Sequence, residues 1–144
     1  MIEKDTIRLL RECDSGVKMG LSSINDVLEK IQNSEFKTEM IECKKEHEEL
    51  QSKIDELLTD YNDDGKQPNP MAKGMSWIKT NVMLSVDDSD NTIADLMTDG
   101  CNMGVKSLSK YLNKYKAADE DSKNIAKKLI KSESKLCEDI RTYL

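Results

Sequence analysis

Cysteine and histidine side chains recur at apolar positions of this sequence, and they define the first chemistry to consider. Cys43 and His47 are four residues apart, so a helix that holds both presents them on one face. Cys101 and Cys137 occupy apolar positions further along the chain. Thiolate and imidazole are ligands that zinc prefers. The candidate metal ligands are therefore Cys43, His47, Cys101 and Cys137, with zinc as the candidate metal.

The same residues also have a purely structural interpretation. A buried cysteine packs as a small hydrophobic side chain, and a histidine at the edge of a core needs only one hydrogen bond. Cys13, the remaining thiol, stands about five residues, or roughly 7 Å, from the level of His47 along a paired helix. One zinc shell made of all four thiols is therefore not expected. We expect no cofactor, a core-edge role for His47, and zinc or thiol chemistry as the alternative.

A six-residue pattern occurs twice, as "CDSGVK" at residues 13–18 and "CNMGVK" at residues 101–106. A glycine within a helix costs about 1 kcal/mol relative to alanine. Gly16 and Gly104 are therefore expected either to bring helices close together or to leave room between them. A small-ligand site in such a cavity is a further alternative. Lys18 and Lys106 are expected on solvated flanks. The alternative is that a lysine reaches a carboxylate on the apolar seam, such as Glu133.

The elements that must position these residues are helices. Apolar residues recur at steps of three and four in four long stretches, which is typical of helices that bury one side. Asn33 or Ser34 is expected to cap the second stretch, and "DDSDN" at residues 87–91 to cap the next long one. A single helix over residues 70–116 would span about 70 Å, so a short extra helix is expected before the third long one.

Two helical hairpins follow from this division, at about residues 2–61 and 91–144, with a crossover at about residues 62–90. An offset of 88 residues aligns the first and third long helices, and an offset of 90 aligns the second and last. The sequence therefore predicts an all-α fold that arose by duplication. Its order is an up-down-down-up four-helix bundle, the arrangement of ferritin-like folds.

Composition limits the classes of partner. A chain of 144 residues with 35% charged and 4% aromatic side chains is expected to form one helical domain. Its net charge of −6 disfavours nucleic acid and anionic lipid. No segment has the length of an apolar membrane span or a secretion signal. The dispersed cysteines favour reduced thiols, and we expect a cytoplasmic protein.

Four segments resemble an uncharacterised bacterial family of the ferritin-like superfamily, distant relatives of rubrerythrins. They are "LLRECDSGVKMGLSSI", "MSWIKTNV", "IADLMTDGCNMGVKSLSKYL" and "KLIKSESKLCEDI". The resemblance covers nearly the whole chain and implies a ferritin-like bundle, without a known activity to transfer.

The superfamily's di-iron site takes a glutamate from each of two helices and Glu-x-x-His from each of the other two. The first repeated window has Asp14 but no glutamate, and the second has no acid. The residue three before His47 is Lys44, and the last helix has no histidine. The di-iron ligands therefore appear lost.

We accordingly expect a non-enzymatic structural or protein-interaction bundle. Its partner is expected to be a second copy or another protein, with Met71, Met75 and Trp77 as candidate interface residues, because methionine and tryptophan suit adaptable surfaces. The alternative is a metal- or thiol-dependent protein that uses the cysteines and His47.

Overall fold

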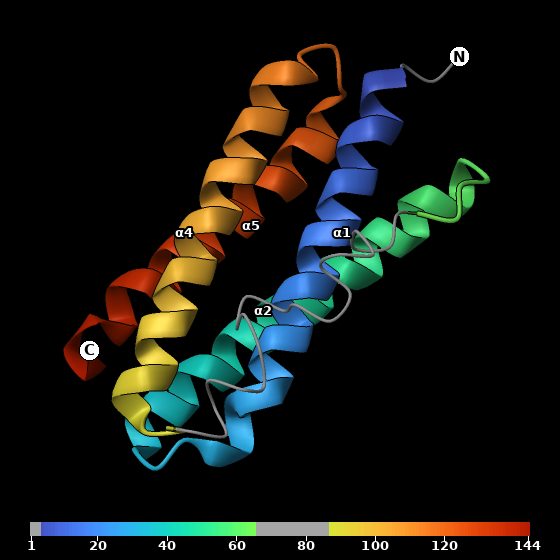
Figure 1. The fold of residues 1–144 in the computed structure, drawn as a ribbon. Helices are drawn as coiled ribbons and strands as arrows, with labels where there is room; N and C mark the ends of the chain where they lie inside the picture. Colours follow the sequence, from blue (N-terminus) through green and yellow to red (C-terminus); the bar gives the residue numbers. More distant parts are fainter. Residues whose placement is uncertain (1–3, 66–86) are drawn as a thin grey trace.

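The computed structural model describes residues 4–65 and 87–144, and these residues form a helical bundle (Figure 1). The α-helices of these two ranges are α1 (Lys4–Val27), α2 (Ser34–Asp60), α4 (Asp90–Lys114) and α5 (Glu120–Asp139). Short 3₁₀ helices follow α1 and α5, namely η1 (Leu28–Lys30) and η2 (Ile140–Tyr143). None of the helices in these ranges has the length and apolar character to span a bilayer. The expected crossover helix and the candidates Met71, Met75 and Trp77 lie outside the described residues.

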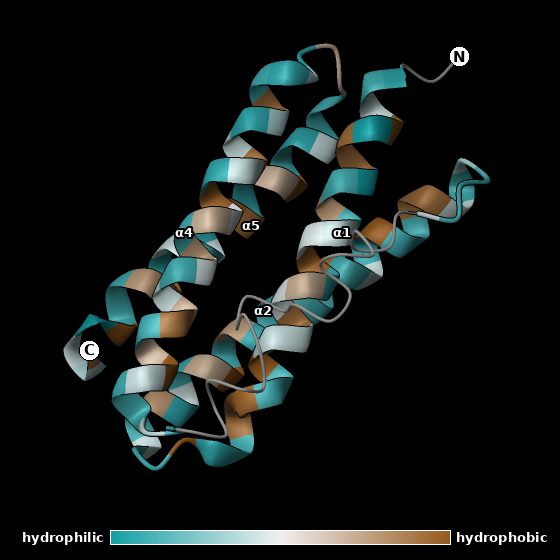
Figure 2. Ribbon diagram, viewed as in Figure 1, coloured by the Kyte–Doolittle hydropathy of each residue, from teal (hydrophilic) through white to brown (hydrophobic). Residues whose placement is uncertain are grey.

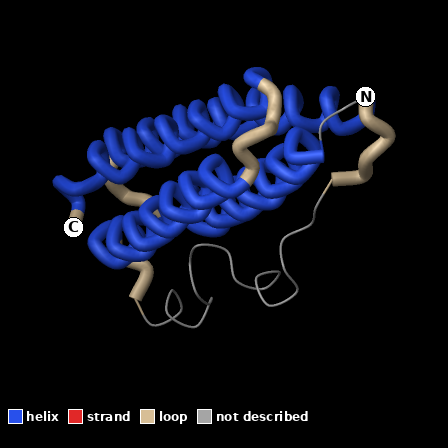
Figure 3. The backbone as a smooth tube through the Cα atoms, turned by 90° about the horizontal axis from the view of Figure 1, so that it is seen from above, coloured by secondary structure: helices blue, strands red, loops and turns tan. Residues whose placement is uncertain are grey.

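The helices pair as two hairpins, which confirms this part of the prediction. Helix α1 packs against α2, and α4 packs against α5. The hairpins meet through α1 against α4, α2 against α5 and α1 against α5. Seen from above, the helices run side by side along a shared direction (Figure 3). Every long helix therefore buries one side against its neighbours.

Side-chain caps define where three of the long helices begin. Asn33, Ser89 and Asp119 are the N-caps of α2, α4 and α5, and each side chain accepts the backbone N–H three residues further on. Such a cap satisfies an amide that has no partner within the helix and stabilises the helix by about 1 kcal/mol. The predicted caps at Asn33 and within residues 87–91 are confirmed.

The turn between α1 and α2 is tied to the start of α4. Backbone N–H groups of Gln32 and Asn33 donate to the two carboxylate oxygens of Asp90, each at 2.9 Å. Because Asp90 is the first residue of α4, this helix starts at the end of the bundle where α1 finishes.

The opposite end of the bundle has a matching arrangement. The N–H of Ala117 donates to Asp5 Oδ2 at 3.2 Å, and the N–H of Asp119 donates to Thr6 Oγ1 at 2.9 Å. Asp5 and Thr6 lie in the first turn of α1, so α1 starts beside the turn that joins α4 to α5. The successive directions of α1, α2, α4 and α5 are thus up, down, down and up.

Two clusters of buried apolar side chains form the core. One includes Phe36, Met40 and Cys43 of α2, near the α1–α2 turn, and the other includes Leu50 and Ile54. These side chains recur at the predicted steps of three and four, and Leu58 is buried further along the same helix. Hydrophobic residues recur along each helix in the same way (Figure 2). The residues that separate the two clusters are polar, and they form the site described next.

Candidate functional site

His47 lies between the two core clusters, on the buried face of α2. Its side chain is 0% exposed, so it lies deeper than the predicted core-edge position. Nδ1 lies 3.0 Å from the backbone oxygen of Cys43 and 3.6 Å from the Cys43 thiol. The carbonyl can only accept a hydrogen bond, so Nδ1 carries a proton. The other ring nitrogen, Nε2, is left to face α5.

Glu133 of α5 is the side chain that Nε2 faces. His47 Nε2 and Glu133 Oε1 are 3.5 Å apart, and both side chains are almost completely buried. This separation is longer than a good hydrogen bond, but two charges at that distance attract strongly where water is excluded. The geometry therefore describes an imidazolium–carboxylate pair at the centre of the bundle.

The protonation of this pair follows from opposing causes. Burial alone would lower the pKa of His47, but the hydrogen bond to Cys43 and the Glu133 carboxylate outweigh burial and raise the pKa to about 10. Burial also raises the pKa of Glu133, and His47 opposes that rise. Burial thus favours the protonated carboxyl group of Glu133, and His47 is the positive neighbour that favours its ionised form.

A cavity of about 270 Å³ lies between α1 and α4, and Glu133 is its most deeply buried lining residue. Glu133 Oε2 has no hydrogen-bond partner among the described residues. This oxygen lies against Gly104, where an added Cβ would be only 2.5 Å away. A buried carboxylate oxygen therefore borders the cavity through a gap that a glycine leaves.

The two copies of the repeated six-residue pattern, one in α1 and one in α4, face each other across this cavity. Three residues of α1 and three of α4 line it at an offset of 88: Ser15 and Met103, Gly16 and Gly104, Met19 and Ser107. The two glycines have different surroundings, because an added Cβ at Gly16 would meet no atom of another described element within 4 Å. The repeated glycine thus makes room on the α1 side and admits a carboxylate on the α4 side.

The four candidate metal ligands are only partly brought together. Cys43 contacts His47, while Cys137 Sγ donates to Asn102 Oδ1 at 3.4 Å. Cys101 is buried in the same core cluster as Cys43 and Cys137. Across residues 4–65 and 87–144, no three or more His, Cys, Asp or Glu side chains are arranged to hold a metal ion. The zinc alternative has no assembled site in the described chain.

All four thiols are buried and unpaired with one another. Burial, followed by the nearby Glu12, Glu133 and Asp14, raises the pKa of the Cys13 thiol to about 12. Burial likewise raises the pKa of Cys101. Because the thiolate is the reactive form, these two thiols are unreactive near neutral pH.

Lys18 does not reach Glu133. Its ammonium group lies 2.8 Å from Oδ2 of Asp14, one turn earlier in α1, and Asp14 is 1% exposed. Gly65, which has a positive φ of 80°, packs beside that carboxylate. Lys18 thus neutralises a different buried acid, on the α1 side of the bundle.

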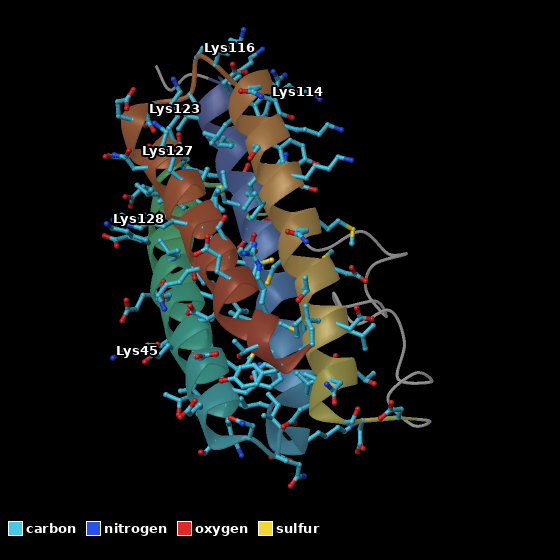
Figure 4. The ribbon with its side chains drawn as sticks, turned by 90° about the vertical axis from the view of Figure 1, so that its left-hand side faces the viewer. Lys45, Lys114, Lys116, Lys123, Lys127 and Lys128 are labelled. Carbon is cyan, nitrogen blue, oxygen red and sulfur yellow. The ribbon has the colours of Figure 1, made fainter. Side chains whose placement is uncertain are left out.

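A hollow of about 540 Å³ lies between α2 and α5. Exposed glutamates and lysines alternate along it, for example Glu46, Glu49 and Lys131. Figure 4 shows Lys127 and Lys128 of α5 directed away from the bundle. Because solvated charges of both signs line this hollow, it has no preference for a ligand of one charge.

Sequence reasoning did not identify Glu133 as a site residue. The signal was present, because Glu133 lies between Leu129 and Leu136 on the apolar seam of α5. An acid on an apolar seam requires a buried partner.

No family model, curated protein or solved structure matches this chain, so the resemblance to the ferritin-like superfamily stays a prediction.

Proposed function

We propose that this chain is a non-enzymatic ferritin-like bundle that binds a small molecule in the cavity between α1 and α4. The up-down-down-up order and the long connection between Asp60 and Asp90 support the ferritin-like assignment. Self-association through Met71, Met75 and Trp77, and a cytoplasmic location, are proposals that rest on sequence alone.

A di-iron centre does not fit the interior of this bundle. Such a centre uses four carboxylates and two histidines. The buried ionisable oxygen and imidazole donors of the described chain are Asp14, Glu133 and His47. Residues 66–86 add no Asp, Glu, His or Cys. Glu133 and His47 already neutralise each other, and Lys18 neutralises Asp14, so these groups stabilise the apo fold.

The cavity beside Glu133 is the observation that carries the binding proposal. Ligand sites in proteins are concave, mostly apolar, and contain a few placed polar groups. Here Leu108 and Met19 supply apolar lining, and the buried carboxylate of Glu133 is one of a few polar groups in the lining. A volume of about 270 Å³ suits a molecule of only several heavy atoms.

Thiol chemistry at Cys43 is less well supported. The Cys43 thiol contacts His47 Nδ1, an arrangement that can activate a nucleophile. However, Cys43 is 3% exposed, and the hollow beside it has a volume of only about 10 Å³. A substrate carbon cannot approach the sulfur there, so the contact is structural.

The binding proposal is tested by filling the cavity. In Gly16→Leu the new side chain enters space that is empty within 4 Å of the Cβ position. In the matched control, Lys106→Leu, the same side chain is added at an exposed position of α4 outside the cavity lining. Small molecules retained by natively purified protein are identified by mass spectrometry.

A molecule that is retained by the wild type and by Lys106→Leu but lost from Gly16→Leu is the expected result. Retention of the same molecules by all three proteins, or by none, would overturn the proposal.

A further inference from the structure

We propose that the cavity between α1 and α4 takes a small alkylammonium ion, with its head group against Glu133 Oε2. This inference rests on the proposed binding function and adds the chemical class of the ligand. It follows from the charge of the lining, the unused oxygen of Glu133 and the shape of the space beside Gly16.

The charge of the cavity lining has one sign. Glu12 and Glu133 contribute carboxylates, and no lysine or arginine is among the described residues that line it. Lys18, which is next to Met19 in the sequence, is paired with Asp14. An anionic ligand would meet two like charges in a partly desolvated space, which costs free energy. A cationic ligand would instead be attracted by the carboxylates of the lining.

Glu133 supplies a specific position for that cation. Its Oε1 is engaged by His47 at 3.5 Å, whereas Oε2 has no partner among the described residues. The Glu133 side chain is 2% exposed, so water does not freely solvate this oxygen. A buried acceptor left without a donor destabilises the folded protein. An ammonium N–H removes that cost and forms a charge-assisted hydrogen bond.

An ammonium ion fits better than a neutral donor such as an alcohol. Burial pushes the Glu133 carboxylate toward its protonated form, and only His47 opposes this. A second positive charge beside Oε2 would stabilise the ionised carboxylate. A hydroxyl group would donate one hydrogen bond but supply no charge. The site is therefore expected to bind an ammonium group much more tightly than a hydroxyl group.

The space around Gly16 limits the rest of the ligand. Among the residues that the structure describes, no atom outside the α1 backbone lies within 4 Å of the position of a Cβ there, and Leu108 and Met19 border the same cavity. A short alkyl chain would bury its apolar surface at roughly 25 cal/mol per Å². A volume of about 270 Å³ excludes large or branched polyamines. The predicted ligand is therefore an unbranched primary amine with a chain of a few carbons.

Three ligands that share a hexyl chain test the head group. Hexylammonium, hexan-1-ol and hexanoate are titrated into the full chain at about pH 7, where the amine is charged, and binding is measured by calorimetry and by NMR shifts. We expect hexylammonium to bind with a dissociation constant below about 1 mM and at least roughly tenfold more tightly than hexan-1-ol. Hexanoate is expected not to bind.

Two variants locate the bound ion. Glu133→Gln keeps the shape of the side chain and is expected to remove the preference for ammonium over alcohol, a loss of roughly tenfold or more. Gly16→Leu is expected to abolish binding of both, whereas Lys106→Leu leaves it unchanged. Because the comparison of ligands is made on the wild type, the test does not depend on how well Glu133→Gln folds.

The outcomes separate the two proposals. If hexan-1-ol binds as tightly as hexylammonium and Gly16→Leu abolishes both, the cavity binds ligands but the inference about charge is overturned. If hexylammonium binds equally well to Gly16→Leu, the ion sits elsewhere and the inference also fails. If none of the three ligands binds, the alkylammonium class is overturned, and the retention experiment above decides the binding function separately.

Discussion

The two glycines of the repeated pattern are predicted to respond oppositely to the same substitution. Gly16 and Gly104 both lie in the middle of long helices, in α1 and α4. Alanine in a helix interior is favoured over glycine by about 1 kcal/mol. At Gly16 an added Cβ meets no atom of a neighbouring element within 4 Å in the described part of the chain, so Gly16→Ala should stabilise the protein by about that amount.

At Gly104 the added methyl group meets the buried carboxylate. It would lie 2.5 Å from Glu133 Oε2, 2.9 Å from Cδ and 3.0 Å from Oε1. Glu133 cannot move without leaving His47, which is 3.5 Å away and fully buried. Overpacking of this kind costs about 1–3 kcal/mol. After the helix gain is subtracted, Gly104→Ala should destabilise the protein by about 0–2 kcal/mol.

The assay is urea unfolding monitored by far-UV circular dichroism. The urea midpoints of the variants and the wild type are compared, provided that the dependence of the unfolding free energy on urea concentration is the same. The two variants should differ by about 1–3 kcal/mol, or several degrees in melting temperature for a chain of this size. A Glu133→Ala background provides the control, because without the carboxylate the cost at Gly104 should disappear. Equal stabilisation by both substitutions in the wild type would refute the packing described here.

Three further predictions concern the buried ionisable groups. His47 is the single histidine; its pKa of about 10 when folded exceeds the value of about 6.5 when unfolded. The folded state therefore keeps a proton that the unfolded chain releases, and the free energy of unfolding should fall between about pH 6.5 and about pH 10 by up to about 1.4 kcal/mol per pH unit. An equal fall in His47→Gln would contradict this. Native thiols, including Cys13 with its pKa of about 12, should react with maleimide only as fast as the protein opens, and immediate labelling of the folded protein would contradict their burial. Asp14→Asn should destabilise the protein by about 1–3 kcal/mol, since it removes the charge that binds Lys18 at 2.8 Å in a buried position; unchanged urea midpoints would show that this pair contributes nothing.

Local chemistry made much of the fold predictable. Asn33 and Ser89 are strong capping residues, and apolar steps of three and four mark which side of each helix is buried. The seam from Phe36 to Ile54 is buried in the order that its spacing predicts. These features depend on residues close together in the chain, so the sequence alone contains them.

The pairing of His47 with Glu133 could not be predicted in the same way. It depends on the rotation and height of α2 relative to α5, which apolar spacing leaves open. The repeat was also misleading on its own, because the offset of 90 that aligns α2 with α5 places Cys43 where α5 has Glu133. Similar glycines therefore face dissimilar neighbours, and only the packed structure reveals which glycine borders empty space.

The hydrogen bonds of Asp5 and Asp90 have a consequence for assembly. Each acid begins one hairpin and accepts backbone N–H groups from the turn of the other. The contacts that align the two hairpins are thus made by the hairpins themselves, and they do not require the hairpins to be covalently joined. Two copies of the chain could exchange hairpins and re-form every one of these bonds, which makes domain swapping and complementation between separate halves inherent in this architecture.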